Sequence, residues 1–313
     1  MREVKSSLRS ISLFTTWLIK ICGILTLPIK HKGFYNLSKL FSLIPSKDEK
    51  ILITLENDSV FEIVLKDPYW NRLLSNYYQY EPEIYFLFNY LKDIKFSFID
   101  GGANWGFWSV IVSSRKFQAV ETVAYEPIPK TFLRLKRNSE LNNNRFKVVQ
   151  KAISTESSNN IEMTIDDDAE LSAVGASISK KSTRRSSSIL VSADGIDQVL
   201  ADLEFKDRVI IKLDLEGVES EVIQASKWID QNDCLLIFED HGKNPHCDVI
   251  QTVLAKNWPI FFIHDNGKII SINSKNQAAL LKKKKSKGYN FFSAYPGGIF
   301  DKTLRSKVSP IYE

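Results

Sequence analysis

Short apolar runs alternate with helical patterns along most of the chain after residue 50. Apolar runs at 51–55 and 61–65, separated by Glu56-Asn57-Asp58, predict a β-hairpin, and the pattern at 82–91, with Pro82 in its first turn, predicts a helix. Five further apolar runs predict strands at 96–100, 122–126, 146–152, 209–214 and 234–240, and helical patterns lie at 104–115, 129–142, 217–228 and 247–257. Unbroken apolar strands separated by helix-length segments are typical of a parallel sheet covered by helices on both faces.

The last strands of the pattern are expected to run antiparallel. The runs at 258–264 and 268–272 flank Asn266-Gly267, a dipeptide that favours a tight hairpin turn, and 289–295 adds one more strand. The predicted fold class is therefore α/β, a Rossmann-like, doubly wound and mostly parallel sheet with antiparallel strands at its C-terminal end. The run Lys282 to Lys285 is interpreted as a solvated turn.

A polar insertion interrupts the alternation at residues 154–188. It is rich in Ser, Thr, Asn and charged residues, and only 161–165 has a strand pattern, so we expect a mobile excursion in which Asp166, Asp167 and Asp168 are solvated turn residues. The predicted organisation is a basic amphipathic helical segment at 1–49, a hairpin and lead-in helix at 50–95, a main domain at 96–300 that contains the insertion, and a tail at 301–313.

The segment 11–27 raises the question of membrane contact. It contains Lys20 and is shorter than the roughly 20 apolar residues that cross a bilayer, so a transmembrane helix is not expected. At about 100° per residue it forms an amphipathic helix that ends before Pro28, with an apolar face made of Ile11, Phe14, Leu18, Ile21, Cys22 and Leu25. Such a helix either packs on the main domain or lies in a membrane interface, where the basic residues of 1–32 assist it.

Charge is distributed unevenly along the 313 residues, whose formal net charge is +5. Residues 1–50 and 280–313 each sum to +6, which leaves −7 for residues 51–279. An acidic centre argues against a nucleic-acid-binding surface, and the basic ends suit an anionic lipid surface or another acidic partner. The three cysteines are far apart in the sequence, which gives no support for a disulfide framework and favours a reducing, cytoplasmic location.

The segment Asp100-Gly101-Gly102-Ala103-Asn104-Trp105-Gly106 follows the first predicted strand of the main domain directly. In an open α/β sheet, ligands bind beyond the carboxyl ends of the strands, where small residues let the backbone approach them. The spacing departs from the dinucleotide fingerprint G-x-G-x-x-G, which would require glycine where the chain has Asn104 and Phe107. An acidic residue at the strand end suits an amino group or hydroxyls and does not suit a pyrophosphate.

Glu126, at the end of the next predicted strand, is placed to bind a ribose diol. A zwitterionic amino acid and a ribose, with no phosphate, are the features of S-adenosylmethionine. The predicted cofactor-binding residues are therefore Asp100, Gly101, Gly102, Ala103, Asn104, Gly106 and Glu126.

Four motifs, in this order and spacing, resemble those of the FkbM-type methyltransferases: FIDGGANWGFWS (98–109), AYEP (124–127), IKLDLEGVE (211–219) and IFEDH (237–241). The resemblance extends from about Tyr80 to Tyr295, with Gly101 where the family usually has Val or Ile. It implies a class I, S-adenosylmethionine-dependent methyltransferase of a family that commonly acts on hydroxyls of sugars, polysaccharides or polyketides.

Methyl transfer to an alcohol requires a group that accepts the hydroxyl proton, because a neutral hydroxyl is a weak nucleophile. Asp214 closes the strand at 209–214, and Glu239 and His241 lie at the end of the strand at 234–240. We expect Asp214 or His241 to be the general base, with Glu239 orienting His241 or the acceptor. Two alternatives stay open: Asp214 caps the following helix while His241 is a loop residue, or the three side chains hold Mg²⁺ or Mn²⁺.

Nearby residues are assigned to structure. Glu219 and Glu221 are interpreted as charges on a helix surface, and Trp105 and Trp108 as packing residues. The fold class alone also admits a nicotinamide-dependent sugar oxidoreductase, because doubly wound sheets host many chemistries. The amphipathic start of the chain leaves open a non-catalytic, membrane-docked protein that retains a disused cofactor fold.

Overall fold

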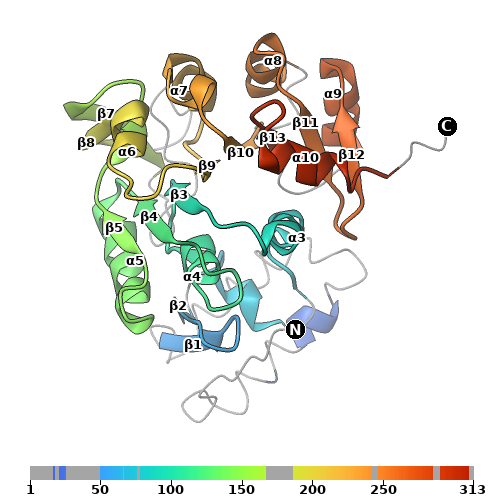
Figure 1. Ribbon diagram of the computed structural model, residues 1–313. Helices are drawn as coiled ribbons and strands as arrows, with labels where there is room; N and C mark the ends of the chain where they lie inside the picture. Colours follow the sequence, from blue (N-terminus) through green and yellow to red (C-terminus); the bar gives the residue numbers. More distant parts are fainter. Residues whose placement is uncertain are drawn as a thin grey trace.

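The computed structural model describes residues 17, 21–25, 50–65, 67–75, 78–166, 186–240, 246–284 and 290–309 (Figure 1). Its centre is an eight-stranded sheet in the order β12-β11-β13-β10-β9-β3-β4-β5. The parallel strands are β3 (Ser97–Gly101), β4 (Glu121–Tyr125), β5 (Lys147–Val149), β9 (Val209–Leu213) and β10 (Cys234–Glu239). β11 (Ile260–Ile263), β12 (Ile269–Ile272) and β13 (Asn290–Ala294) extend the sheet in antiparallel pairings, which confirms the predicted fold class.

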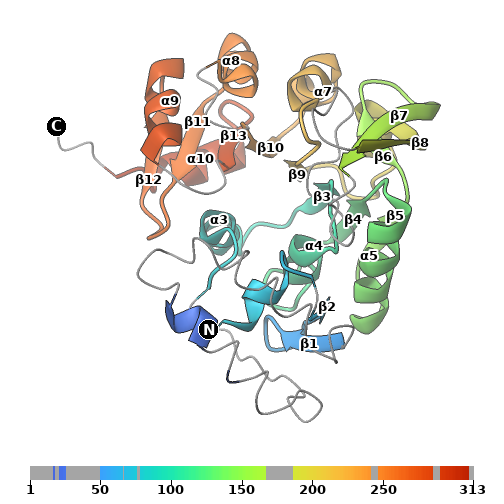
Figure 2. The same ribbon diagram turned by 180° about the vertical axis from the view of Figure 1, so that it is seen from behind.

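Helices cover both faces of this sheet, and each face has its own apolar core. Figures 1 and 2 show α7 (Glu219–Ala225), α8 (Asp248–Ala255) and α9 (Lys275–Lys284) on one side, and α3 (Pro82–Leu91) and α4 (Phe107–Val112) on the other. Alternate strand residues point to opposite sides, so Phe98 and Ile210 join one buried cluster while Ile99 and Ile211 join the other. α6 (Ile196–Ala201) packs with the second cluster, whereas α5 (Pro129–Leu141) and α10 (Ile299–Arg305) contribute to the first.

The predicted N-terminal hairpin is confirmed as β1 (Lys50–Thr54) and β2 (Val60–Val64). Two asparagine side chains at the end of α5 bind the free edge of β2. Glu62 N donates to Asn138 Oδ1 at 2.7 Å, and Val60 N donates to Asn142 Oδ1 at 2.9 Å. These bonds replace the ladder that a third strand would form and fix the hairpin to the main domain. Two short 3₁₀ helices, η3 (Asn71–Leu74) and η4 (Ile229–Gln231), lie in connections.

A second, three-stranded sheet contains β6 (Ala152–Ser154), β7 (Ser158–Asp166) and β8 (Ser186–Gly195) in the order β6-β8-β7. The single strand predicted at 146–152 is therefore wrong, because the chain leaves the main sheet after β5 and enters this sheet as β6. The strand predicted at 161–165 lies within β7, but it is not alone, since it pairs with β8. Only one face of this sheet is buried, against a small core that includes Met163 and Val191, so polar residues dominate its composition.

The turn predicted at Lys282 to Lys285 is wrong, because Lys282 lies within α9 and its side chain is buried. Its ammonium is paired with Asp240 Oδ1, next to the end of β10. Composition alone indicates that a lysine run is solvated, but it cannot reveal a buried partner that lies far away in the sequence. The predicted tail boundary at residue 301 falls within α10, whose Phe300 and Leu304 are buried.

Little of the N-terminal segment is described, and within the described part some residues pack on the core while others are exposed. Cys22 belongs to the main core, and a Cβ on Gly23 would lie 2.7 Å from Ser75 Oγ. Trp17 and Leu25 are instead 66% and 64% exposed, so Leu25 does not share the buried side with Cys22 as the predicted apolar face required. Ile11, Phe14 and Leu18 lie outside the described residues, as do Asp167 and Asp168. Within the described part of the chain, no helix has the length and apolar character to cross a membrane.

Candidate active site

The glycine-rich loop that follows β3 is held against the segment that follows β9. Gly102 has a φ of +70°, and a Cβ there would lie 1.9 Å from the carbonyl oxygen of Asp214. Asp214 N donates to the carbonyl oxygen of Gly101 at 3.1 Å, and Ala103 N donates to that of Tyr125 at 2.9 Å. Only glycine combines this conformation with such a close approach, so the loop joins the carboxyl ends of β3, β4 and β9.

Asp100 has the features expected of a carboxylate that meets a cationic group. It is 1% exposed, and its Oδ2 accepts a hydrogen bond from Ser109 Oγ at 2.6 Å. Its Oδ1 is buried and accepts no hydrogen bond from the described residues. Burial raises the pKa of this carboxyl group, while the nearby Lys212 ammonium opposes the shift. A buried oxygen with no donor fits the ammonium group of an amino acid, because a charge left unpaired there is costly.

Glu126 lies beside the same loop, as the sequence predicted. Its Oε2 accepts a hydrogen bond from Asn104 N at 3.0 Å, and its Oε1 accepts one from Ile128 N at 2.9 Å. Burial raises the pKa of Glu126 to about 8 against these two bonds, and the charges of Asp214 and Asp100 add to the shift. Each carboxylate oxygen retains acceptor capacity, which is what a ribose diol requires.

Asn104 and Gly106 shape the loop. Asn104 is in the left-handed region with a φ of 52°, and its Oδ1 accepts hydrogen bonds from Trp70 Nε1 at 3.1 Å and Trp105 N at 2.9 Å. Gly106 has a φ of +84° at the start of α4. The side-chain oxygen of Asn104 is therefore bound within the protein, and it is the backbone N–H of Asn104 that donates to Glu126.

Lys212, which no sequence pattern marks as a site residue, lies at the centre of the acidic groups. It is opposite Asp100 in the register of β9 and β3, and its Nζ lies 3.0 Å from Asp214 Oδ2. Burial alone would lower its pKa, but Asp214, Asp100 and Glu81 together raise it. A lysine within an apolar strand gives no sign of this role until the neighbouring strands are known.

Glu81 is a second member of the cluster that the sequence pattern does not predict. It precedes α3, and its Oε2 accepts a hydrogen bond from Trp108 Nε1 at 2.6 Å. Burial raises the pKa of Glu81 to about 7, the Lys212 ammonium opposes the shift, and Glu83 and Asp214 add to it. The only local signal was its position before Pro82 at a predicted helix start, which does not connect it to the strand ends.

The structure describes two of the three predicted catalytic residues. Asp214 lies in the acidic cluster with 27% of its side chain exposed, and Glu239 ends β10, the strand next to β9. His241 lies outside the described residues. Among the residues that are described, no group of three His, Cys, Asp or Glu side chains has the arrangement of a metal site.

The interpretation of Glu219 as a surface charge is wrong. It is 1% exposed, and its two carboxylate oxygens accept hydrogen bonds from Leu215 N at 2.8 Å and Gly217 N at 3.0 Å. It therefore fixes the loop after β9 in place. Glu221 is exposed as expected, and Trp105 and Trp108 are buried packing residues, as predicted.

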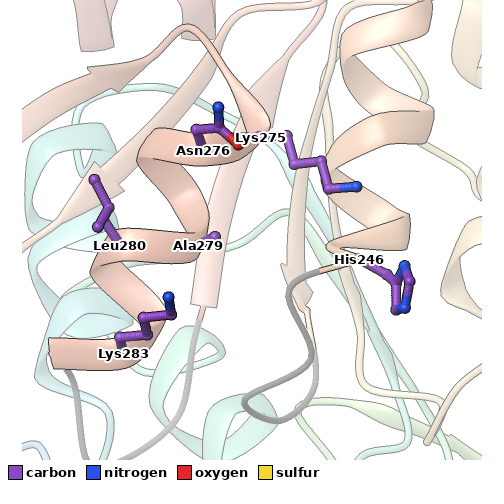
Figure 3. Close-up of a pocket in the computed structure, with 6 residues that line it drawn as sticks. All are labelled: His246, Lys275, Asn276, Ala279, Leu280 and Lys283. Atoms are coloured by element: carbon purple, nitrogen blue, oxygen red, sulfur yellow. The ribbon is translucent and has the colours of Figure 1, made fainter.

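A surface hollow of about 420 Å³ lies between α8 and α9 (Figure 3). Its lining residues are His246, Lys275, Asn276, Ala279, Leu280 and Lys283. None of them is a predicted site residue, and the basic side chains differ from the acidic groups at the strand ends. The acidic cluster is therefore the candidate active site.

Comparisons with known proteins identify the family of the chain. The model of the methyltransferase FkbM domain matches residues 100–266, which begin at Asp100 and include Glu126 and Asp214. No curated protein sequence matches the chain.

Several solved structures are similar to this chain at low identity. A methyltransferase FkbM from Methylobacillus flagellatus KT is 15% identical, with 85% of this chain and 62% of that chain covered and a TM-score of 0.39. TYW2 of M. jannaschii, in complex with AdoMet, is 13% identical, with 80% and 87% covered and a TM-score of 0.39. The precorrin-6y C5,15-methyltransferase of Geobacter metallireducens GS-15 is 12% identical, with 68% and 86% covered and a TM-score of 0.37. Because the FkbM family model covers more than half of the sequence, the chain belongs to the FkbM family of S-adenosylmethionine-dependent methyltransferases.

Proposed function

We propose that the protein methylates a hydroxyl group of a sugar, polysaccharide, glycolipid or polyketide-like acceptor. One observation carries the proposal: the acidic groups at the strand ends differ in exposure. Asp100 and Glu126 are 1% and 4% exposed, whereas 27% of the Asp214 side chain is accessible. The buried acids suit the polar ends of a cofactor, and the more exposed acids can reach the hydroxyl of a second molecule.

The residues present fit S-adenosylmethionine, which supplies an electrophilic methyl group on a sulfonium when bound. The unpaired Asp100 Oδ1 suits its ammonium group, and Glu126 suits its ribose diol. Gly101, Gly102 and Ala103 keep the loop narrow, so that backbone rather than side chains lies next to the ligand. The acidic surroundings favour a ligand with positive charge.

The remaining requirement is a group that accepts the hydroxyl proton. Asp214 and His241 are the candidates predicted from the sequence, with Glu239 as the orienting residue. Asp214 is in the acidic cluster, and the end of β10 that carries Glu239 lies beside the end of β9. Removing the proton as the new bond forms contributes about 10²–10⁴-fold to such a reaction.

Incubation with methyl-labelled S-adenosylmethionine and extracts that contain cell-surface glycans or lipid precursors tests the proposal. We expect the label in a methyl ether of one glycan or lipid-linked product, identified by mass analysis. Asp214→Asn and His241→Ala should lower turnover much more than cofactor affinity, while Glu221→Gln, at an exposed position of α7, serves as the control. Label recovered on nitrogen or carbon would contradict the proposed acceptor class.

We also propose that residues 1–32 contact a membrane surface from one side. The described part of this segment supports the proposal, because Trp17, Ile24 and Leu25 are 66%, 56% and 64% exposed while Cys22 packs in the core. A segment that is attached through one side and apolar on the other is suited to an interface, and the basic residues around it add attraction to anionic lipid.

A further inference from the structure

Glu81 occupies the position of a helix cap without acting as one. It immediately precedes α3, at the position where a short polar side chain such as Ser or Asp often accepts a hydrogen bond from the first turn, and its own side chain makes no capping bond. Its carboxylate is turned away from the helix and binds the indole nitrogen of Trp108 on α4 at 2.6 Å. The side chain of Glu81 is thus bound to α4 and not to the first turn of α3.

The backbone of Glu81 is in an unusual conformation as well. Its φ of 41° and ψ of 61° lie in the left-handed region, which a non-glycine residue enters at a cost of about 1 kcal/mol or more. Such conformations persist where the surrounding structure imposes them, and they cluster at functional sites. The local geometry therefore favours the placement of this carboxylate over the stability of the helix start.

The charged and titratable groups around Glu81 come from several elements. Lys212 and Asp214 face it from β9 and the segment that follows, Glu83 from α3 itself, and Tyr80 and Tyr69 from the segment before α3. Asp214 Oδ2 is committed to an ion pair with Lys212. In contrast, Glu81 Oε1 accepts no hydrogen bond from any residue that the structure describes, and Glu81 is partly exposed. Glu81 and Asp214 are both partly exposed, but within the described residues only Asp214 forms an ion pair with Lys212, whereas Glu81 is held by the neutral indole of Trp108.

We propose that Glu81, in place of Asp214 or His241, is the general base that accepts the proton of the acceptor hydroxyl, and this assignment rests on the proposed function. The O–H bond of the acceptor breaks and its proton forms a new O–H bond on Glu81 Oε1. The electron pair left on the acceptor oxygen forms the bond to the methyl carbon, and sulfur keeps the pair of the carbon–sulfur bond that breaks. Trp108 holds Oε2 and so fixes the direction of Oε1, which makes it a positioning residue.

The protonation behaviour of Glu81 agrees with this role. Its pKa of about 7, raised by burial against the pull of Lys212, lies near neutrality, where a base is both unprotonated in part and strong enough to take a proton. An exposed glutamate, with a pKa of about 4.3, would be a far weaker base.

Aromatic side chains beside Glu81 suit a ring-shaped acceptor. The hydroxyls of Tyr69 and Tyr80 are 2.8 Å apart, and both residues are partly exposed. Tyr80 packs edge to face on Phe107 with ring centroids 4.8 Å apart, which fixes its orientation. A rigid aromatic surface next to a carboxylate base can hold the apolar face of a sugar ring while one hydroxyl meets the base.

Steady-state kinetics of a Glu81→Gln variant tests the assignment. Gln retains an oxygen that can accept the Trp108 bond but cannot take the proton. With labelled S-adenosylmethionine and a panel of methyl glycosides, we expect kcat of the wild type to rise with pH around a midpoint near 7. In Glu81→Gln, kcat should fall by about 10²–10⁴-fold and this rise should disappear, with little change in cofactor affinity by calorimetry. Glu81→Asp should recover part of the rate and of the pH dependence.

A spectroscopic readout accompanies the kinetics and does not depend on activity. The ¹⁵N–¹H indole resonance of Trp108, assigned with Trp108→Phe, should shift with pH around the same midpoint in the wild type and in the control Asp93→Asn, an exposed residue beyond the end of α3. The shift should be absent in Glu81→Gln. Loss of the indole resonance pattern as a whole would identify misfolding, in which case Glu81→Asp decides.

The outcomes separate the two proposals. Wild-type transfer to a hydroxyl with an unimpaired Glu81→Gln variant would overturn the assignment of Glu81 and leave the proposed function intact. No wild-type transfer to any hydroxyl acceptor, with label on nitrogen or carbon instead, would overturn the proposed function and the role of Glu81 with it.

Discussion

At the scale of single residues, Gly102 is the position where the loop tolerates least change. Its φ is +70°, and a Cβ would lie 1.9 Å from the carbonyl oxygen of Asp214. Gly102→Ala should therefore separate the loop from the end of β9, abolish cofactor binding in calorimetry and destabilise the protein by about 3 kcal/mol or more. Gly297→Ala is the matched control, because Gly297 has a φ of +74° but a Cβ there would meet no atom within 4 Å, so only about 1 kcal/mol should be lost. Equal losses in urea unfolding would show that backbone strain, and not the close approach, is responsible.

The raised pKa values of Glu81 and Glu126 predict a pH dependence of stability. Their folded-state values of about 7 and about 8 lie above the value of about 4.5 expected in the unfolded chain, so the folded state binds more protons between these limits. Their contribution to stability is therefore complete below pH 4.5 and is lost as the pH rises through 7 and 8. Glu81→Gln removes one of these groups, and the difference in unfolding free energy between variant and wild type should shift in favour of the variant as pH rises. Urea unfolding across this pH range measures the difference, and a constant value would contradict the protonation assigned to Glu81.

At the scale of elements, Asp240 joins β10 to both helices beside it. Asp240 Oδ1 is paired with Lys282 of α9, and Oδ2 accepts a hydrogen bond from Ile250 N of α8 at 3.1 Å. Lys282→Met should cost about 3–5 kcal/mol, because it leaves a buried carboxylate without its cation. The adjacent Lys283 is exposed, and Lys283→Met should change the unfolding free energy by less than about 0.5 kcal/mol. If both variants unfold alike, the buried pair does not anchor α9.

Features that depend on local sequence signals were predicted correctly, whereas roles that depend on contacts between distant segments were not. The helix predicted at 82–91 matches α3, since its apolar spacing and Pro82 are local signals. The predicted acids Asp100 and Glu126 reach one loop, because the ends of adjacent parallel strands meet at one edge. Lys212 and Glu81 escaped prediction, since their roles depend on partners from other strands and helices. The same reason explains Glu219, whose two backbone donors lie in a loop with no periodic pattern.

At the scale of the whole molecule, the fold does not identify the reaction, whereas the family match does. A doubly wound sheet admits a nicotinamide-dependent oxidoreductase as readily as a methyltransferase, and the order of strands does not distinguish them. The match of residues 100–266 to the FkbM domain decides for methyl transfer. The region before this match supplies the hairpin, which is bound to α5, and Glu81, which lies beside the cluster. The main domain therefore holds the predicted cofactor-binding residues, while the preceding segment adds Glu81 from outside the family match.

Both ends of the chain are basic, and the membrane contact proposed for the N-terminal segment can be tested directly. Trp17, Ile24 and Leu25 are exposed, so a triple substitution to serine should leave the free energy of unfolding nearly unchanged. The same variant should bind vesicles that contain phosphatidylglycerol much more weakly than the wild type does, because both the apolar contact and the placement of the nearby basic residues depend on this segment. Leu190→Ser is the control, since Leu190 is 69% exposed on β8 and lies outside the segment. Flotation with anionic and with neutral vesicles measures the binding. Equal flotation of the triple variant and the wild type would mean that the segment serves only to pack Cys22 and Gly23 against the core.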